Sequence, residues 1–139
     1  MPANDMAALR KRLAAIAPAV KEAVMPALEK SGDELVATMQ HLAPVDTGAL
    51  RESITATPAG QATPAYSQGD GGGGEIVPEG TVRVTAGDAD ARYAHLVEHG
   101  TADAPAQPFF FPAFRSARPR IAERVKRAVI KAANEEWAK

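Results

Sequence analysis

The sequence predicts an α+β fold in a single domain, residues 1–139, with N-terminal helices and a long C-terminal helix packed on a small antiparallel β-sheet. Three observations support this prediction. The chain of 139 residues suits one hydrophobic core. Apolar residues recur at steps of three and four near both ends, whereas the middle alternates with a period of two only in short segments. Aromatic residues make up only 5% of the chain, which argues against a β-sandwich.

The N-terminal region, residues 5–42, is predicted to be helical. Leu9, Leu13 and Ile16 form one apolar stripe, which indicates a helix from residue 5 to residue 17. Because proline lacks a backbone N–H, we expect Pro18 to break this helix or to open a second one. The second helix is expected to kink near Pro26 and to end at about residue 42, before Pro44.

The region 50–87 is expected to form a β-hairpin. After a turn at residues 44–48, where the side chain of Asp46 or Thr47 can accept a backbone N–H, the β-branched residues of 52–57 indicate a short strand. Residues 59–75 contain six glycines, four of them in succession, which predicts a mobile loop. The alternation of residues 81–85 indicates the second strand, with further strands considered at 75–79 or 101–110.

Two further helices are expected near the C-terminus. Tyr93, Leu96 and Val97 lie at i, i+3 and i+4, which predicts a short helix over residues 92–100 that ends on Gly100 in the left-handed αL conformation. An apolar stripe after Pro112 predicts the last helix, residues 112–137. Pro119 is expected to bend this helix or to move its start to about residue 118.

Composition excludes several classes of function. The chain has no cysteine, so disulfides, thiolate metal sites and cysteine nucleophiles are ruled out. Neither a signal peptide nor a membrane-spanning segment is expected, and no cofactor is predicted. The net charge is -1, but residues 44–108 hold three basic and nine acidic side chains, while residues 109–139 hold eight and three. These regions either face each other within one subunit or attract neighbouring copies head to tail.

One pattern suggests catalysis. His95, Glu98 and His99 match the H-x-x-E-H arrangement, in which two histidines on one helical face hold zinc and the glutamate acts as general base. A small zinc-dependent peptidase is therefore the alternative function. Gly100 is expected to end the helix directly after His99, no third ligand is evident, and the pattern arises readily by chance.

Nucleic-acid contact is a second open question. Residues 69–74 lack the lysine and the helix of a phosphate-binding loop. The last helix carries basic residues that suit either a subunit interface, a DNA channel or simply a solvated surface. A small DNA-binding regulator would need tight duplex binding, which the net charge disfavours. The phenylalanines at 109–111 and 114 are expected in the core or as a plug between subunits. The candidate interface or DNA-channel residues are Arg115, Arg118, Arg120, Arg124 and Arg127.

Three blocks occur in a fixed order. They are APVDTGALRESI at 43–54, YAHLVEHGT at 93–101 and PAQPFFFPA at 105–113. In this order, between an N-terminal and a C-terminal helix, they resemble the tail-completion or head-tail joining (neck) morphogenesis proteins of long-tailed bacteriophages. The resemblance covers residues 5–135, and the ordered triple is more specific than any single block. The glycine-rich stretch around residues 60–75 departs from the family pattern.

The resemblance implies a non-enzymatic phage or prophage structural protein, located in the virion at the head-tail interface or tail end and assembled in the bacterial cytoplasm. Its implied partners are copies of itself in a ring around the DNA path, neighbouring connector or tail proteins and, transiently, packaged DNA, with no membrane and no catalytic residue. The matching positions are expected to shape turns, dock the short helix and anchor the last helix. These positions are Pro44, Thr47, Gly48, Leu50, Ser53, Ile54, Tyr93, Val97, Glu98, Gly100, Thr101, Pro108, Phe109 and Pro112.

Overall fold

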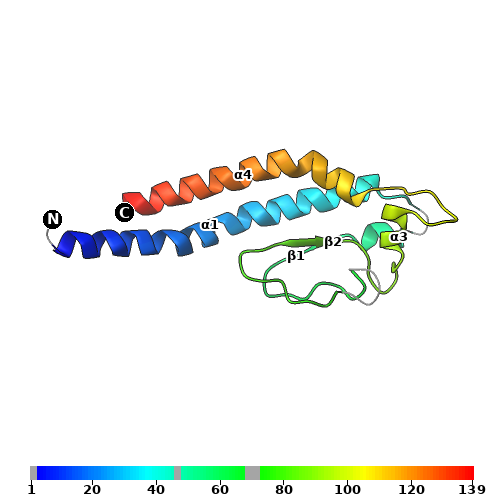
Figure 1. Cartoon of the computed structure of the whole chain (residues 1–139), viewed down its shortest axis with the longest axis horizontal. Coiled ribbons are helices and arrows are strands. Elements are labelled where there is room, and N and C mark those ends of the chain that lie inside the picture. Colours follow the sequence, from blue (N-terminus) through cyan, green and yellow to red (C-terminus); the bar gives the residue numbers. More distant parts are fainter. Residues whose placement is uncertain (1–2, 46–47, 68–72) are drawn as a thin grey trace.

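The computed structural model describes residues 3–45, 48–67 and 73–139, and it confirms the α+β class. Two long helices, α1 (Ala3–Leu42) and α4 (Phe110–Ala138), run antiparallel side by side, so that both chain ends lie at one end of the molecule (Figure 1). The strands β1 (Thr55–Thr57) and β2 (Arg83–Thr85) pack on the second half of α1. The short helices α2 (Ala49–Glu52) and α3 (Ala94–His99) lie at the end opposite the termini.

The N-terminal region is one helix, so the predicted break at Pro18 is wrong. α1 continues through both Pro18 and Pro26 and ends at Leu42, as expected before Pro44. Both prolines lie on the exposed face, as do Ala14 and Glu22, the residues four positions before them. Water can therefore solvate the carbonyl groups that the prolines leave unbonded, while the opposite face stays packed along α4.

The sheet is smaller than predicted. β1 and β2 pair antiparallel with Ala56 opposite Val84, and part of the predicted first strand forms α2 instead. The glycine-rich connection was predicted to be mobile, but its described parts are paired. Ala62 bridges Ile76, and the Thr63 backbone exchanges hydrogen bonds with Glu75 and Gly74 at 2.9 and 3.0 Å. Val77 is buried here, so apolar packing contributes to ordering this segment. Residues 68–72 lie outside the described part of the chain.

The last helix starts two residues earlier than predicted, at Phe110, and runs unbroken through Pro119. Pro119 therefore does not move its start, and the helix bends over the end of α1 (Figure 1). Three alanines of α4 are buried, Ala113, Ala117 and Ala132, and their small side chains let the two helices approach closely. No described helix combines the length and the hydropathy that crossing a bilayer requires.

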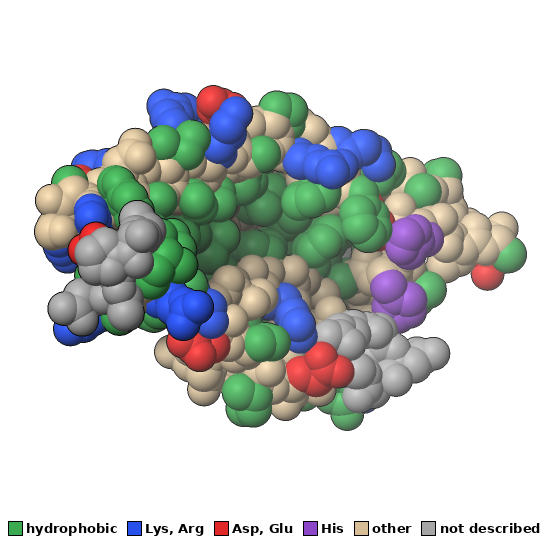
Figure 2. Space-filling model, turned by 60° about the vertical axis from the view of Figure 1, so that its left-hand side comes forward, with side chains coloured by type: hydrophobic (Ala, Val, Ile, Leu, Met, Phe, Trp, Pro, Cys, Tyr) green, Lys and Arg blue, Asp and Glu red, His purple; other side chains and the backbone are tan. Residues whose placement is uncertain are grey.

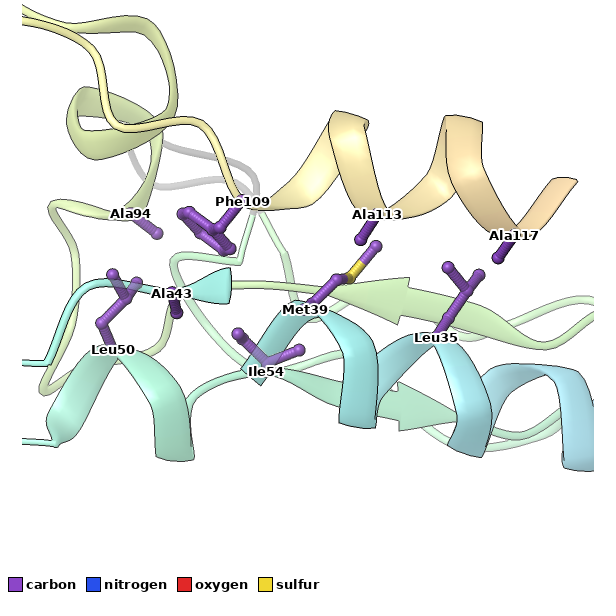
Figure 3. Close-up of a cluster of buried hydrophobic side chains, with 9 residues drawn as sticks. All are labelled: Leu35, Met39, Ala43, Leu50, Ile54, Ala94, Phe109, Ala113 and Ala117. Carbon is purple, nitrogen blue, oxygen red and sulfur yellow. The ribbon is translucent and has the colours of Figure 1, made fainter. Parts of the chain in front are cut away.

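The core lies where the two long helices meet the short helices. Leu35 and Met39 of α1 face Ala113 and Ala117 of α4, and Phe109 lies between them and Ala94 of α3 (Figure 3). Full burial of a leucine, methionine or phenylalanine side chain contributes about 1.5–3 kcal/mol each. Beyond this core the two helices extend toward the termini as a helical arm, residues 3–27 and 122–138.

Close packing of α1 on the sheet depends on Gly32. A Cβ atom at this position would lie 3.0 Å from Cγ1 of Val82 and 3.2 Å from Cβ of Ala56. Glycine normally weakens a helix interior, but here the absent side chain lets the strands approach the helix axis.

Replacing Gly32 with leucine is expected to lower the free energy of unfolding by about 1–3 kcal/mol, because the larger side chain forces the sheet away from α1. Chemical denaturation followed by circular dichroism measures the change. Ala37→Leu, on the exposed face of the same helix, serves as control and should shift stability by less than about 0.5 kcal/mol. Equal stability of the Gly32→Leu variant and wild type would contradict this packing.

Candidate functional site

The three sequence blocks meet at the end of the helix pair opposite the termini. Leu50 and Ile54 from the first block, Ala94 from the second and Phe109 from the third are all buried in one cluster (Figure 3). Val97 packs against the same cluster from α3. Residues up to 59 positions apart in the sequence therefore build one junction.

The first block is tied to the sheet by Ser53. Its hydroxyl donates to the Leu50 carbonyl at 2.6 Å and accepts from the Gly87 N–H at 3.0 Å. Gly48 precedes α2 with φ +89°, a conformation that favours glycine, and Pro44 is half-buried after α1. Asp46 and Thr47, one of which is expected to accept a backbone N–H at this turn, lie outside the described residues.

Glu98 closes the N-terminus of α4. One carboxylate oxygen, Oε2, accepts the backbone N–H groups of Phe109 and Phe110 at 2.7 and 2.9 Å, and Oε1 accepts that of Phe111 at 3.0 Å. The first four N–H groups of a helix have no partner within it. Counted from the N-cap residue Phe109, the fourth of these groups would belong to Pro112, which has no N–H. Glu98 therefore satisfies all three donors that remain.

The electrostatics of this contact favour the ionised carboxylate. Burial of Glu98 acts to raise its pKa, but the hydrogen bonds from the three backbone N–H groups outweigh burial and hold the pKa below its ordinary value, with a smaller effect from His99. The positive end of the α4 dipole stabilises the same charge. Glu98 is thus a buried anion whose positive partner is a helix end.

The link between α3 and α4 requires glycine at position 100. Gly100 has φ +79° and ψ 171°, which is an extended conformation rather than the αL conformation predicted, and it is open almost only to glycine. A Cβ atom there would lie 2.7 Å from the Ala106 backbone nitrogen. Thr101 then folds the following turn, because its hydroxyl accepts the N–H groups of Asp103 and Ala104.

The residues of the second and third blocks that are expected to dock helices differ in how deeply they are buried. Tyr93 is 39% exposed, and its neighbour Ala94 is buried instead. Pro108 is exposed, whereas Phe109 is 1% exposed and anchors the start of α4. Of the remaining phenylalanines, Phe110 packs against the core, while Phe111 and Phe114 are exposed.

The histidine pattern does not assemble a zinc site in the described part of the chain. His95 and His99 are exposed, and the ring of His99 lies against that of Phe111 with centroids 6.2 Å apart. Both oxygens of Glu98 are engaged by α4, so this carboxylate is not free to act as a base. Among residues 3–45, 48–67 and 73–139, no group of three histidine, aspartate or glutamate side chains is placed to hold a metal ion.

Beside Glu98 lies a pocket of about 340 Å³ between β2, α3 and the start of α4. Its face of the molecule is hollowed and largely hydrophobic, with histidine side chains at one end (Figure 2). Val84, Ala86, Phe110 and Phe111 supply apolar walls. The hydroxyl groups of Thr85 and Ser67, which also line the pocket, have no hydrogen-bond partner among the described residues.

Two of the five candidate arginines bind within the chain. Arg124 pairs with Glu34 of α1 at 2.6 Å and donates to the Ser31 hydroxyl at 2.9 Å, and Arg120 pairs with the other oxygen of Glu34. The hydrogen bond from Arg124 is the main cause that lowers the pKa of Glu34, which desolvation partly opposes. Arg115, Arg118 and Arg127 are exposed, and none of them forms an ion pair with a described residue.

The sequence did not indicate the role of Glu34, and it placed Glu98 among the motif positions and in the histidine pattern without indicating that this residue caps α4. Glu34 carries no local signal, because its partners lie 86 and 90 positions away in the chain. For Glu98 a signal exists. No serine, threonine, aspartate or asparagine precedes the helix that begins near Pro112, so its first N–H groups need an acceptor from elsewhere in the chain.

Comparison with protein families identifies one match. The family described as "Bacteriophage HK97-gp10, putative tail-component" matches residues 7–100. The matched region includes the first block and the second block as far as Gly100, but not the third block or α4. No curated protein and no solved structure matches the chain.

Replacing Glu98 with glutamine should lower the free energy of unfolding by about 1–3 kcal/mol, because a neutral amide leaves part of the helix end unsatisfied. Thermal and denaturant unfolding measure the loss. Glu123→Gln, which removes an exposed charge from α4, is the control, with an expected change below about 0.5 kcal/mol. Equal stabilities of the two variants would rule out the capping role.

Acid should remove the same stabilisation. The pKa of Glu98 in the folded protein lies below its ordinary value of 4.5, so its contribution is complete above pH 4.5 and is lost as pH falls through the folded pKa. The pKa of Glu34 is also lowered, so the free energy of unfolding decreases further when this group is protonated at low pH. We expect the stability difference between wild type and Glu98→Gln to shrink as pH falls from 7 to 3. A constant difference across this range would contradict the assignment.

Proposed function

Since the chain belongs to the HK97-gp10-like family of bacteriophage tail components, we propose that it is a non-enzymatic structural protein of tail completion or head-tail joining, and that it forms a ring of identical subunits around the DNA path. The family match over residues 7–100 is the observation that carries the proposal. It supports a virion component built from repeated protein contacts.

The distribution of charge supports contacts between copies. The loops at the α3 end carry exposed Asp90 and Asp103, whereas α4 carries most of the basic side chains of the last 31 residues. Opposite charges on different faces of one subunit favour head-to-tail contacts, and such contacts close into rings when the rotation between subunits divides a full turn.

The ion pairs within the chain determine which arginines of α4 are available for contacts with another subunit. Arg120 and Arg124 hold α4 against α1 through Glu34. Arg115, Arg118 and Arg127 keep their charges exposed, and we assign these three to a neighbouring subunit or to DNA that passes through the ring. Neighbouring connector or tail proteins are the other proposed partners, at the head-tail interface or tail end, with assembly in the bacterial cytoplasm.

Charge reversal at the exposed arginines should weaken assembly. In the variant Arg118→Glu/Arg127→Glu, repulsion from the acidic loops replaces attraction, so the mass measured by light scattering should fall toward that of a monomer. High salt should lower the wild-type mass in the same way, because ions screen exposed charges.

The double variant Lys21→Glu/Lys30→Glu makes the same change of charge at exposed positions in the middle of α1 and should keep the wild-type mass. Circular dichroism checks that each variant is folded. A mass that neither salt nor the α4 variant alters would contradict the proposed electrostatic contact.

The role in the particle is tested in the parent phage or prophage. Without this gene, electron micrographs should show heads and tails that accumulate unjoined. Complete particles of normal length and normal infectivity would refute a role in tail completion or head-tail joining.

A further inference from the structure

The pocket beside Glu98 contains polar groups that the described chain leaves unpaired. Thr85 is 5% exposed, and its Oγ1 has no hydrogen-bond partner. The hydroxyl of Ser67, on the same pocket, is also unpartnered. A buried hydroxyl without a partner costs about 1–3 kcal/mol, so this pair of groups points to a ligand that supplies the missing hydrogen bond.

The shape and charge of the pocket restrict that ligand. Its volume of about 340 Å³ lies at the lower end of ligand sites and suits one large side chain between the apolar walls. Two charged side chains that line it are already paired within the chain, because Arg83 binds Glu75 at 3.1 Å and the oxygens of Glu98, the only acid among the lining residues, are engaged by α4. An uncharged aromatic side chain that carries a hydrogen-bond donor fits these features.

The chain itself carries such a group at its other end. Trp137, the only tryptophan in the sequence, is 41% exposed in the last turn of α4, next to Glu135 and Glu136. One face of its ring is covered by the Arg12 guanidinium, 4.1 Å from the ring centroid. The indole N–H group makes no hydrogen bond to a described residue.

A subunit cannot place its own Trp137 in its own pocket. The pocket includes the first residues of α4, whereas Trp137 lies near the end of this 29-residue helix, roughly 40 Å away at 1.5 Å per residue (Figure 1). The two features lie at opposite ends of the molecule, so they can meet only between copies.

We infer that Trp137 of one copy docks into the pocket between β2, α3 and α4 of the next copy, with its indole N–H donating to the Thr85 hydroxyl. This inference rests on the proposed ring and defines one of its contacts. Because the two halves of the contact differ, the contact is heterologous, as a ring requires.

Fluorescence and mass test the contact together. Because Trp137 is the only tryptophan, its emission maximum should shift to shorter wavelength as rising protein concentration drives assembly. Trp137→Ala removes the docking group, and Ala86→Phe fills the pocket. Each variant should raise the concentration needed for assembly at least tenfold while remaining folded by circular dichroism.

Mixing the two variants gives the sharpest readout. The Trp137→Ala variant keeps an open pocket, and the Ala86→Phe variant keeps the tryptophan that can fill it. A mixture of the two should therefore form one such contact and no further one, which yields a species of twice the monomer mass. Thr85→Val should weaken assembly without lowering thermal stability, because it removes a hydroxyl that has no partner in the isolated subunit.

The outcomes separate this inference from the proposed ring. Rings of unchanged mass in Trp137→Ala, with no fluorescence shift in wild type, overturn the docking contact and leave the ring intact. A wild-type protein that stays monomeric at every concentration overturns the contact as well as self-assembly. A mixture of the two variants that shows no species of doubled mass also overturns the contact.

Discussion

The carboxylate of Glu98 is the interaction on which the arrangement of this molecule depends. It joins the end of α3 to the start of α4 and satisfies every N–H that the first turn of α4 offers, with Pro112 removing the one that it does not reach. An anion at a helix N-terminus is stabilised by the helix dipole as well as by its hydrogen bonds. The position of α4, and with it the packing of Phe109, Ala113 and Ala117 on α1, starts from this contact.

The same contact changes the meaning of the histidine pattern. A glutamate between two histidines suggests a metal-dependent hydrolase, yet this glutamate is committed to backbone N–H groups, and the imidazoles beside it are exposed. The family match favours a structural component of the phage tail, and the buried cap gives Glu98 a structural role. The pocket next to the cap, with its unpaired hydroxyl groups, is the surface that we propose as the docking site for a second copy.

Periodicity predicted the elements well where one face of a helix is buried along its length, as in α1 and α4. It failed at Pro18, because the cost of a helical proline depends on whether the carbonyl four residues earlier faces water, which Ala14 does. The backbone hydrogen bond between Thr63 and Glu75 and the pairing of Glu34 with Arg124 join residues 12 and 90 positions apart, and no local pattern encodes them. Glu98 could be identified from the sequence as a carboxylate within a motif. Its partners could not, because they are backbone N–H groups of another segment, and a motif of side chains does not indicate backbone contacts.

The most direct test of the account is amide hydrogen exchange at Phe109, Phe110 and Phe111, measured residue by residue by NMR at neutral pH. The first N–H groups of a helix exchange rapidly unless a side chain binds them. The account predicts slow exchange at all three amides in the wild-type protein and a joint acceleration when Glu98 is replaced by alanine. Rapid exchange at these amides in wild type, or exchange that the replacement leaves unchanged, would contradict it.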